Sequence, residues 1–265
     1  MYLKHVNCQP LFGYVYFEHT TRLTREAWKM KVDIWFDYAC PFCYIGKRSL
    51  EAAINEFIHK DQIDIQYHSY QLQPDAPKNS GSNIHELIAG KYGTTVEHAK
   101  KMNEHISEQA REVGLTFRFD TMIPTNTGDA HRLTHYAKKQ GKNHELTEQI
   151  FNAYFTVSLH IGDETTLLKL ANEIGLPEKE VMDVLKTGKY KKELDHDIQT
   201  GVQIGIQGVP FFVFNHKYAI SGAQSAETFK EVLMDVWEEE YNGTLLALKK
   251  QTKSEFCTGE SCDTP

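Results

Sequence analysis

Two cysteines separated by Pro-Phe stand where a predicted strand gives way to a predicted helix. The run Cys40-Pro41-Phe42-Cys43 follows the apolar segment 32–36 and precedes residues 44–57, in which apolar side chains recur at helical spacing. The unpaired N–H groups and the positive dipole end of a helix N-terminus stabilise a thiolate, which is the nucleophile in disulfide exchange. A second cysteine about one helical turn further on can close a disulfide with the first. The sequence therefore predicts a dithiol–disulfide redox site.

The spacing of the two cysteines is not specific by itself, because half of a zinc site has the same spacing. Apolar and polar residues alternate from Ile63 to Tyr67, which predicts a second strand after the helix. Strand, CxxC, helix and strand in this order form the β-α-β context that a redox site requires. Far downstream, Val209-Pro210 opens the apolar run 211–214, and a proline, which cannot donate to a β ladder, marks the start or the edge of a strand.

With these motifs the chain resembles the DsbA-family thioredoxin-like oxidoreductases, in particular their FrnE-like branch. The resemblance spans roughly residues 30–242 and is carried by residues 33–46, 73–75, 126–133, 155, 161–163, 205–214 and 221–224. It implies an α/β chain with a thioredoxin-like fold and a large all-helical insertion domain. It also implies that Cys40 is the attacking thiolate and that Cys43 is the resolving thiol.

The resemblance assigns Val209-Pro210 to a loop that faces the substrate, with a cis peptide bond before the proline. Such a bond leaves the N–H and C=O of Val209 free to pair with an extended substrate, in the manner of strand addition. The alternative is an ordinary trans proline that opens a strand. Pro41 and Phe42, which stand between the two cysteines, are also expected to contact substrate.

The order of the predicted elements divides the chain into segments. Residues 30–80 and 190–242 are expected to form the thioredoxin-like domain, and residues 81–189, where helical periodicity dominates, the helical insertion domain. Residues 1–29 precede the family-like sequence, and we interpret them as a weakly ordered extension without a catalytic role. The polar segment 243–265 is expected to be a flexible tail.

The tail contains a second cysteine pair, Cys257 and Cys262. On a flexible tether, such a pair has an effective concentration of roughly millimolar order near the main site. We predict that Cys257 and Cys262 form a second dithiol that exchanges electrons with Cys40 and Cys43. Two tail cysteines without a partner are the alternative.

The predicted insertion contributes Asn126 and His131 as candidate site residues. Both are interpreted as lying over the cysteine pair, where they shape the cleft or tune the thiolate, because a cationic imidazole stabilises a neighbouring thiolate. The alternative is local, with Asn126 capping a helix.

Residues next to the cysteines receive more modest assignments. Tyr44 is expected to line the mouth of the site. Lys47 and Arg48, one turn beyond Cys43, are interpreted as solvated charges on the helix. No role is assigned to Asp37 or Tyr38, although a carboxylate so close to a thiolate would oppose its formation.

Composition and charge exclude several classes of partner. The formal net charge of −7 and the lack of a polybasic run argue against nucleic-acid binding. No apolar run approaches the ~18 residues that a membrane span requires. Residues 1–28 lack the uninterrupted apolar region of a secretory signal, so we expect a cytoplasmic protein, in which cysteine pairs are more often catalytic or metal-binding than structural.

Three function classes follow. The leading one is a protein disulfide oxidoreductase that acts on protein or low-molecular-weight thiols and disulfides without a cofactor, glutathione being the only candidate. The second is a glutathione-assisted isomerase or transferase of the 2-hydroxychromene-2-carboxylate isomerase or kappa type, which usually carries Ser at the position of Cys40. The third is a zinc site of Cys40, Cys43, Cys257 and Cys262. The Pro-Phe dipeptide and the distance between the pairs in sequence argue against it, so no metal is expected.

Overall fold

The computed structural model describes residues 29–242 of the chain. A four-stranded mixed sheet forms its centre, with β1 (Met30–Phe36), β2 (Ile63–Ser69), β3 (Phe211–Phe214) and β4 (Tyr218–Ser221) in the order β2-β1-β3-β4. β1 pairs parallel with β2 and antiparallel with β3, and β3 pairs antiparallel with β4. β1 is buried along almost its whole length, because it has a neighbour on each side and helices on each face.

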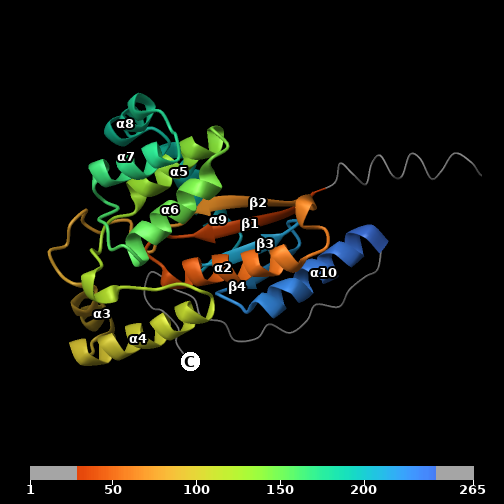
Figure 1. Cartoon of the computed structure of the whole chain (residues 1–265), viewed down its shortest axis with the longest axis horizontal. Helices are drawn as coiled ribbons and strands as arrows, with labels where there is room; N and C mark the ends of the chain where they lie inside the picture. The colour runs from red at the N-terminus through yellow and green to blue at the C-terminus, as the bar shows by residue number, and fades with distance from the viewer. Residues whose placement is uncertain (1–28, 243–265) are drawn as a thin grey trace, which may run out of the picture.

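Helices cover both faces of the sheet. α2 (Pro41–Glu56) and α10 (Ala226–Asn242) lie side by side on the face to which Ile34 and Phe212 point, as Figure 1 shows. α9 (Lys191–Gln203) lies on the other face, where the indole Nε1 of Trp35 donates to the carbonyl oxygen of Asp197 over 3.0 Å. Alternate residues of β1 thus pack against different helices.

The remaining helices fall between β2 and α9 in the sequence. They are α3 (Ile84–Tyr92), α4 (Val96–Glu112), α5 (Gly128–Lys139), α6 (Asn143–Phe155), α7 (Glu164–Glu173) and α8 (Glu178–Thr187), with short 3₁₀ turns η1 (Lys60–Gln62) and η2 (Phe119–Thr121). Figure 1 shows α5 to α8 grouped at the β2 side of the sheet, and α3 and α4 together near the N-terminal end of α2.

The predicted fold class is confirmed: strand, helix, strand, a long helical stretch, and then helix, two strands and helix follow one another. The exact division into residues 30–80 with 190–242 and 81–189 stays a prediction. Residues 1–28 and 243–265 lie outside the described residues. The predictions of a weakly ordered extension, of a flexible tail and of a second dithiol of Cys257 and Cys262 therefore concern parts of the chain that the structure does not describe. Within residues 29–242, no helix is both long and apolar enough to cross a membrane.

Candidate functional site

The cysteine pair lies at the junction of β1 and α2. After Phe36 the chain turns, and the N–H of Cys40 donates to the carbonyl oxygen of Asp37 over 3.1 Å. Cys40 has extended backbone angles and occupies the N-cap position of α2, with Pro41 as the first helical residue. The helix therefore begins where the sequence predicts it, and Cys40 stands at its positive end.

The two thiols are free, buried and close together. Cys40 is 0% exposed and Cys43 2%, and the two residues lie 3.5 Å apart. Burial, followed by the hydrogen bond and the charge of Cys40, raises the pKa of Cys43 well above that of an ordinary thiol. Cys43 therefore keeps its proton at neutral pH, as a resolving thiol would before its turn to react.

The loop at Val209-Pro210 faces Cys40, and its peptide bond is cis, as predicted. The Cys40 thiol donates to the carbonyl oxygen of Val209 over 3.4 Å. This carbonyl, expected to be free for a substrate, is thus engaged by the reduced cysteine, and Val209 is fully buried. The loop approaches α2 closely at Gly46, where an added Cβ would lie 3.3 Å from Cγ of Pro210.

Asp37, to which no role was assigned, is a central buried group. Only 1% exposed, its carboxylate accepts hydrogen bonds from the Thr127 hydroxyl and the Leu72 N–H, both over 2.8 Å, and from the Ala39 N–H over 3.3 Å. Nε2 of His131 lies 3.3 Å from the same carboxylate. Asp37 therefore joins the cysteine turn to the segments before α3 and at the start of α5. The sequence signal for this buried role is an acidic residue within the apolar run 34–39.

Among the described residues, the polar contact of His131 is with Asp37 and not with a cysteine. Its ring is fully buried, 5.2 Å from the ring centre of Phe36 and 4.9 Å from that of Tyr38, and its polar contact is with Asp37. Its Nδ1 has no hydrogen-bond partner among the described residues. The structure therefore gives His131 a contact with the Asp37 carboxylate, and its action on the thiolate stays a prediction.

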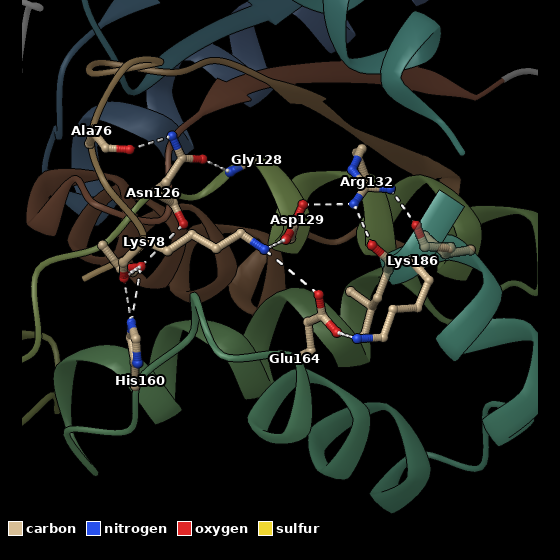
Figure 2. A network of polar contacts seen from close by, with 12 residues as sticks. Ala76, Lys78, Asn126, Gly128, Asp129, Arg132, His160, Glu164 and Lys186 are labelled. Atoms are coloured by element: carbon tan, nitrogen blue, oxygen red, sulfur yellow. Dashed lines mark hydrogen bonds and ion pairs between the residues drawn. The ribbon is translucent and has the colours of Figure 1, made fainter. Parts of the chain in front are cut away.

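Asn126 holds a loop rather than covering the thiols. Figure 2 shows its side chain between Ala76 and Gly128: Nδ2 donates to the carbonyl oxygens of Pro74 and Ala76 over 2.8 and 3.0 Å, and Oδ1 accepts from the Gly128 N–H over 2.8 Å. The contact with Gly128, the first residue of α5, resembles the predicted alternative in which Asn126 caps a helix. The contacts with Pro74 and Ala76 fix the segment between β2 and α3.

The predictions for Tyr44 and Lys47 are wrong, whereas Arg48 is partly solvated, with 35% of its side chain exposed. Tyr44 does not line a mouth: it is 1% exposed, stacks on Phe151 with ring centres 5.0 Å apart, and donates from its hydroxyl to Glu148 over 2.7 Å. Lys47 is 4% exposed and pairs with the carboxylate of Glu148 over 2.6 Å, and Arg48 pairs with the same residue. These charges face α6, whose position the sequence of α2 alone does not reveal.

A cavity of about 400 Å³ lies beside the cysteine turn and is bounded there by Ala39 and Pro41. Its other walls come from the segment before α3, from α3, α4 and η2, and from the end of α6. Of the residues expected to contact substrate, Pro41 lines this cavity. Phe42 is fully buried, and its ring is not among the described residues that line the cavity.

The described residues offer no alternative metal centre. Within residues 29–242, no group of three or more His, Cys, Asp and Glu is placed to hold a metal ion. The zinc site considered above needs Cys257 and Cys262, which lie outside this range.

Comparisons with known proteins agree with this geometry. The family model of the DSBA-like thioredoxin domain matches residues 31–234. A probable DsbA oxidoreductase from Streptomyces coelicolor is 34% identical, with a TM-score of 0.76 over 89% of this chain and 99% of that one.

Two more distant structures share the fold. A 2-hydroxychromene-2-carboxylate isomerase is 13% identical, with a TM-score of 0.64 over 81% of this chain and 100% of that one. The cytosolic disulfide reductase DsbM from Pseudomonas aeruginosa is 14% identical, with a TM-score of 0.56 over 78% and 98% of the two chains. The FrnE-like branch stays a prediction. The chain belongs to the family of DSBA-like thioredoxin domains.

Proposed function

We propose that this chain is a thiol–disulfide oxidoreductase in which Cys40 attacks and Cys43 resolves. The observation that carries the proposal is the asymmetry of the pair. Cys40 occupies the N-cap position at the positive end of α2, whereas Cys43 lies within the helix and has a pKa raised by burial. One thiol is thus placed to be the nucleophile while the other keeps its proton.

The exchange follows from these positions. The Cys40 thiolate attacks one sulfur of a substrate disulfide, an S–S bond forms between them, and the other substrate sulfur leaves as a thiolate that takes a proton from water. Cys43 then loses its proton to solvent and attacks the Cys40 sulfur, so that the second substrate thiol leaves. The substrate gains two electrons and the protein becomes a disulfide. The reverse sequence oxidises a substrate dithiol.

Substrates are proposed at the level of chemistry. Protein disulfides and low-molecular-weight disulfides both fit the exchange, and glutathione is a candidate thiol because DsbM, a protein of the same fold, has been solved with it. The protein-disulfide activity, the cytoplasmic location and the relay through Cys257 and Cys262 are further parts of this proposal.

Two cysteine variants test the roles. Cys43→Ser is expected to accumulate a mixed disulfide at Cys40 when it is mixed with a disulfide substrate, because nothing resolves it, and intact-protein mass spectrometry would detect the adduct. Cys40→Ser is expected to form no adduct on the same timescale. Adducts of equal yield in both variants would contradict the assigned roles.

The reduction potential sets the direction of electron flow. Equilibration of the wild type with glutathione buffers is expected to give a reversible two-electron couple; about −270 mV would favour a reductase and about −120 mV an oxidant. Truncation at residue 248 tests the relay: an unchanged potential and unchanged turnover of protein substrates would remove Cys257 and Cys262 from the mechanism. Absence of any couple would overturn the redox function and favour the glutathione-assisted isomerase.

A further inference from the structure

The cavity beside Cys40 is apolar and its walls are well fixed. Its apolar lining includes Ile84, Ile88, Met102, Ile106, Met122 and Phe155. At about 400 Å³ it is within the range of ~300–1,000 Å³ that small-molecule sites occupy. Because Ala39 and Pro41 line the cavity and flank Cys40 in the chain, a molecule in this cavity would lie beside the turn that carries the attacking sulfur.

A polar network holds the wall that faces α3. Besides the contacts of Asn126 with Pro74 and Ala76, the Thr125 hydroxyl donates to the carbonyl oxygen of Lys78 over 2.6 Å. The Lys78 ammonium in turn pairs with Asp129 over 2.6 Å, and Figure 2 shows this chain of contacts running from the loop to α5. A wall held from outside in this way exists before any ligand arrives, so binding costs little ordering of the loop.

One lining residue of the described chain is charged: Lys91, near the end of α3. Within residues 29–242 it forms no ion pair, and its ammonium lies 5.7 Å from the ring centre of Tyr92. Partial burial lowers the pKa of Lys91, and the negative charge of a Cys40 thiolate opposes that shift. An apolar chamber with one cation, beside a nucleophilic sulfur, is complementary to an apolar anion.

A molecule held in the cavity lies at the cysteine turn before it reacts. Cys40 is 0% exposed, so any disulfide reaches its sulfur only when the surrounding side chains shift, and a molecule already bound beside Ala39 and Pro41 is close when they do.

We propose that the cavity takes a low-molecular-weight disulfide with an aromatic or similarly apolar body and a carboxylate, the carboxylate at Lys91 and the disulfide at Cys40. This inference rests on the proposed oxidoreductase function and narrows its substrate class. Cys40 attacks the nearer sulfur, one arylthiolate leaves, and resolution by Cys43 releases the second, so the disulfide gains the two electrons that the dithiol loses.

Three disulfides used as probes separate the contributions: dithiobis-nitrobenzoate, which is aromatic and anionic; dithiodipyridine, which is aromatic and neutral; and hydroxyethyl disulfide, which is small and polar. Lys91→Gln is expected to slow oxidation of the reduced protein by the first probe about fivefold, the effect of one partly solvated charge pair, and by the second less than about twofold. Lys91→Arg should restore the rate, and Lys101→Gln, an exposed change on α4, should leave all rates unchanged.

Ala76→Phe fills the cavity without removing any atom of its wall. It is expected to slow both aromatic probes about tenfold and hydroxyethyl disulfide less than about twofold, since each tenfold loss corresponds to ~1.4 kcal/mol of binding. Equal slowing of all three probes by Ala76→Phe, or of both aromatic probes by Lys91→Gln, would overturn the inference.

A binding measurement separates this inference from the proposed function. Nitrobenzoate has no sulfur, so its binding to the full chain, followed by calorimetry, does not require a redox couple. We expect Lys91→Gln and Ala76→Phe to weaken it. Failure to bind by a protein with an intact couple overturns the inference and leaves the oxidoreductase function. Binding by a protein without a couple overturns the oxidoreductase function and, with it, the disulfide as substrate, and leaves only the site for an apolar anion.

Discussion

At the scale of single residues, the approach of the cis-proline loop to the cysteine helix depends on Gly46. A Cβ at this position would lie 3.1 Å from Cζ of Phe212 and 3.3 Å from Cγ of Pro210. Both distances are shorter than ordinary van der Waals contact, so a side chain there would push the loop that carries Val209 away from Cys40.

Gly46→Ala is therefore expected to destabilise the protein by about 1–3 kcal/mol, the usual cost of overpacking a close contact. Urea unfolding measures the change. Gly90→Ala is the matched control, because Gly90 lies in α3 with nothing within 4 Å of an added Cβ, and there alanine should be neutral or stabilising by up to about 1 kcal/mol. A Gly46 variant as stable as the Gly90 variant would show that the loop yields without cost.

Asp37 is the second residue on which the site depends. Its two carboxylate oxygens accept from different segments, Thr127 on Oδ1 and Leu72 on Oδ2. An asparagine keeps only one acceptor, so one buried donor must lose its partner. Asp37→Asn is expected to cost about 1–3 kcal/mol of unfolding free energy, the penalty for a buried donor left unsatisfied.

The same substitution has a chemical consequence. Burial is the main reason that the pKa of Cys43 is high, but the Asp37 charge also raises it. Asp37→Asn in a Cys40→Ser background should therefore shift the pH profile of Cys43 alkylation to lower pH than in Cys40→Ser alone. A purely structural role for Asp37 would lower stability and leave this profile in place.

At the scale of elements, α2 is fixed to α6 by one carboxylate. Glu148 accepts from Tyr44 and pairs with Lys47 and Arg48, which lie within about one turn of α2. Burial alone would raise the pKa of Glu148, but the two cations and the hydroxyl outweigh it and lower the pKa. Its contribution to stability is therefore present above the unfolded-state pKa of about 4.3 and is lost as the pH falls through the lower folded value.

Glu148→Gln is expected to destabilise the protein at pH 7 by about 1–2 kcal/mol, because the nearly buried Lys47 retains only its pair with Glu51. Thermal or urea unfolding measures it. Glu97→Gln, which breaks an exposed 3.5 Å pair with Lys101 on α4, should change stability by less than about 0.5 kcal/mol. Equal effects of the two substitutions would mean that Glu148 acts as an ordinary surface charge.

The sequence predicts these elements better than their contacts. Periodicity and the CxxC motif predict α2, its start at Pro41 and the strands on either side, because these depend on neighbours along the chain. The roles of Lys47 and Tyr44 depend on Glu148, about 100 residues away, and α2 alone predicts them as solvated or exposed. For the same reason the sequence does not predict the contact of His131 with Asp37.

At the scale of the whole molecule, a second charge cluster joins the sheet to α9. His68 on β2 lies between two carboxylates, with Nε2 2.7 Å from Asp33 of β1 and Nδ1 3.1 Å from Asp197 of α9. His135 of α5 approaches Asp197 to 3.3 Å, and His216, in the turn between β3 and β4, approaches Asp33 to 3.6 Å. The His68 imidazole therefore connects β1 with α9, two elements that lie far apart in the sequence.

The pH dependence of this cluster is predictable in sign. Burial lowers the pKa of His68, but the hydrogen bonds to Asp197 and Asp33 outweigh it and raise the pKa above 6.5. The stability that His68 contributes is thus fully present below about pH 6.5, its unfolded-state pKa, and is lost as the pH rises through the higher folded value. Asp197 behaves oppositely: burial would raise its pKa, but the hydrogen bonds to His135 and His68 and the charge of His68 lower it, so its contribution is lost as the pH falls through the lowered value.

His68→Gln should therefore cost most at pH 5–6 and progressively less toward pH 9. The difference from the wild type should narrow by no more than about 1.4 kcal/mol per pH unit, the limit for one proton. Urea unfolding of both proteins at each pH measures it. His98→Gln, on the exposed side of α4, is the matched control and is expected to change stability little. A His68 difference that stays constant from pH 5 to 9 would mean that the imidazole joins sheet and helix by neutral hydrogen bonds, without the positive charge that two flanking carboxylates favour.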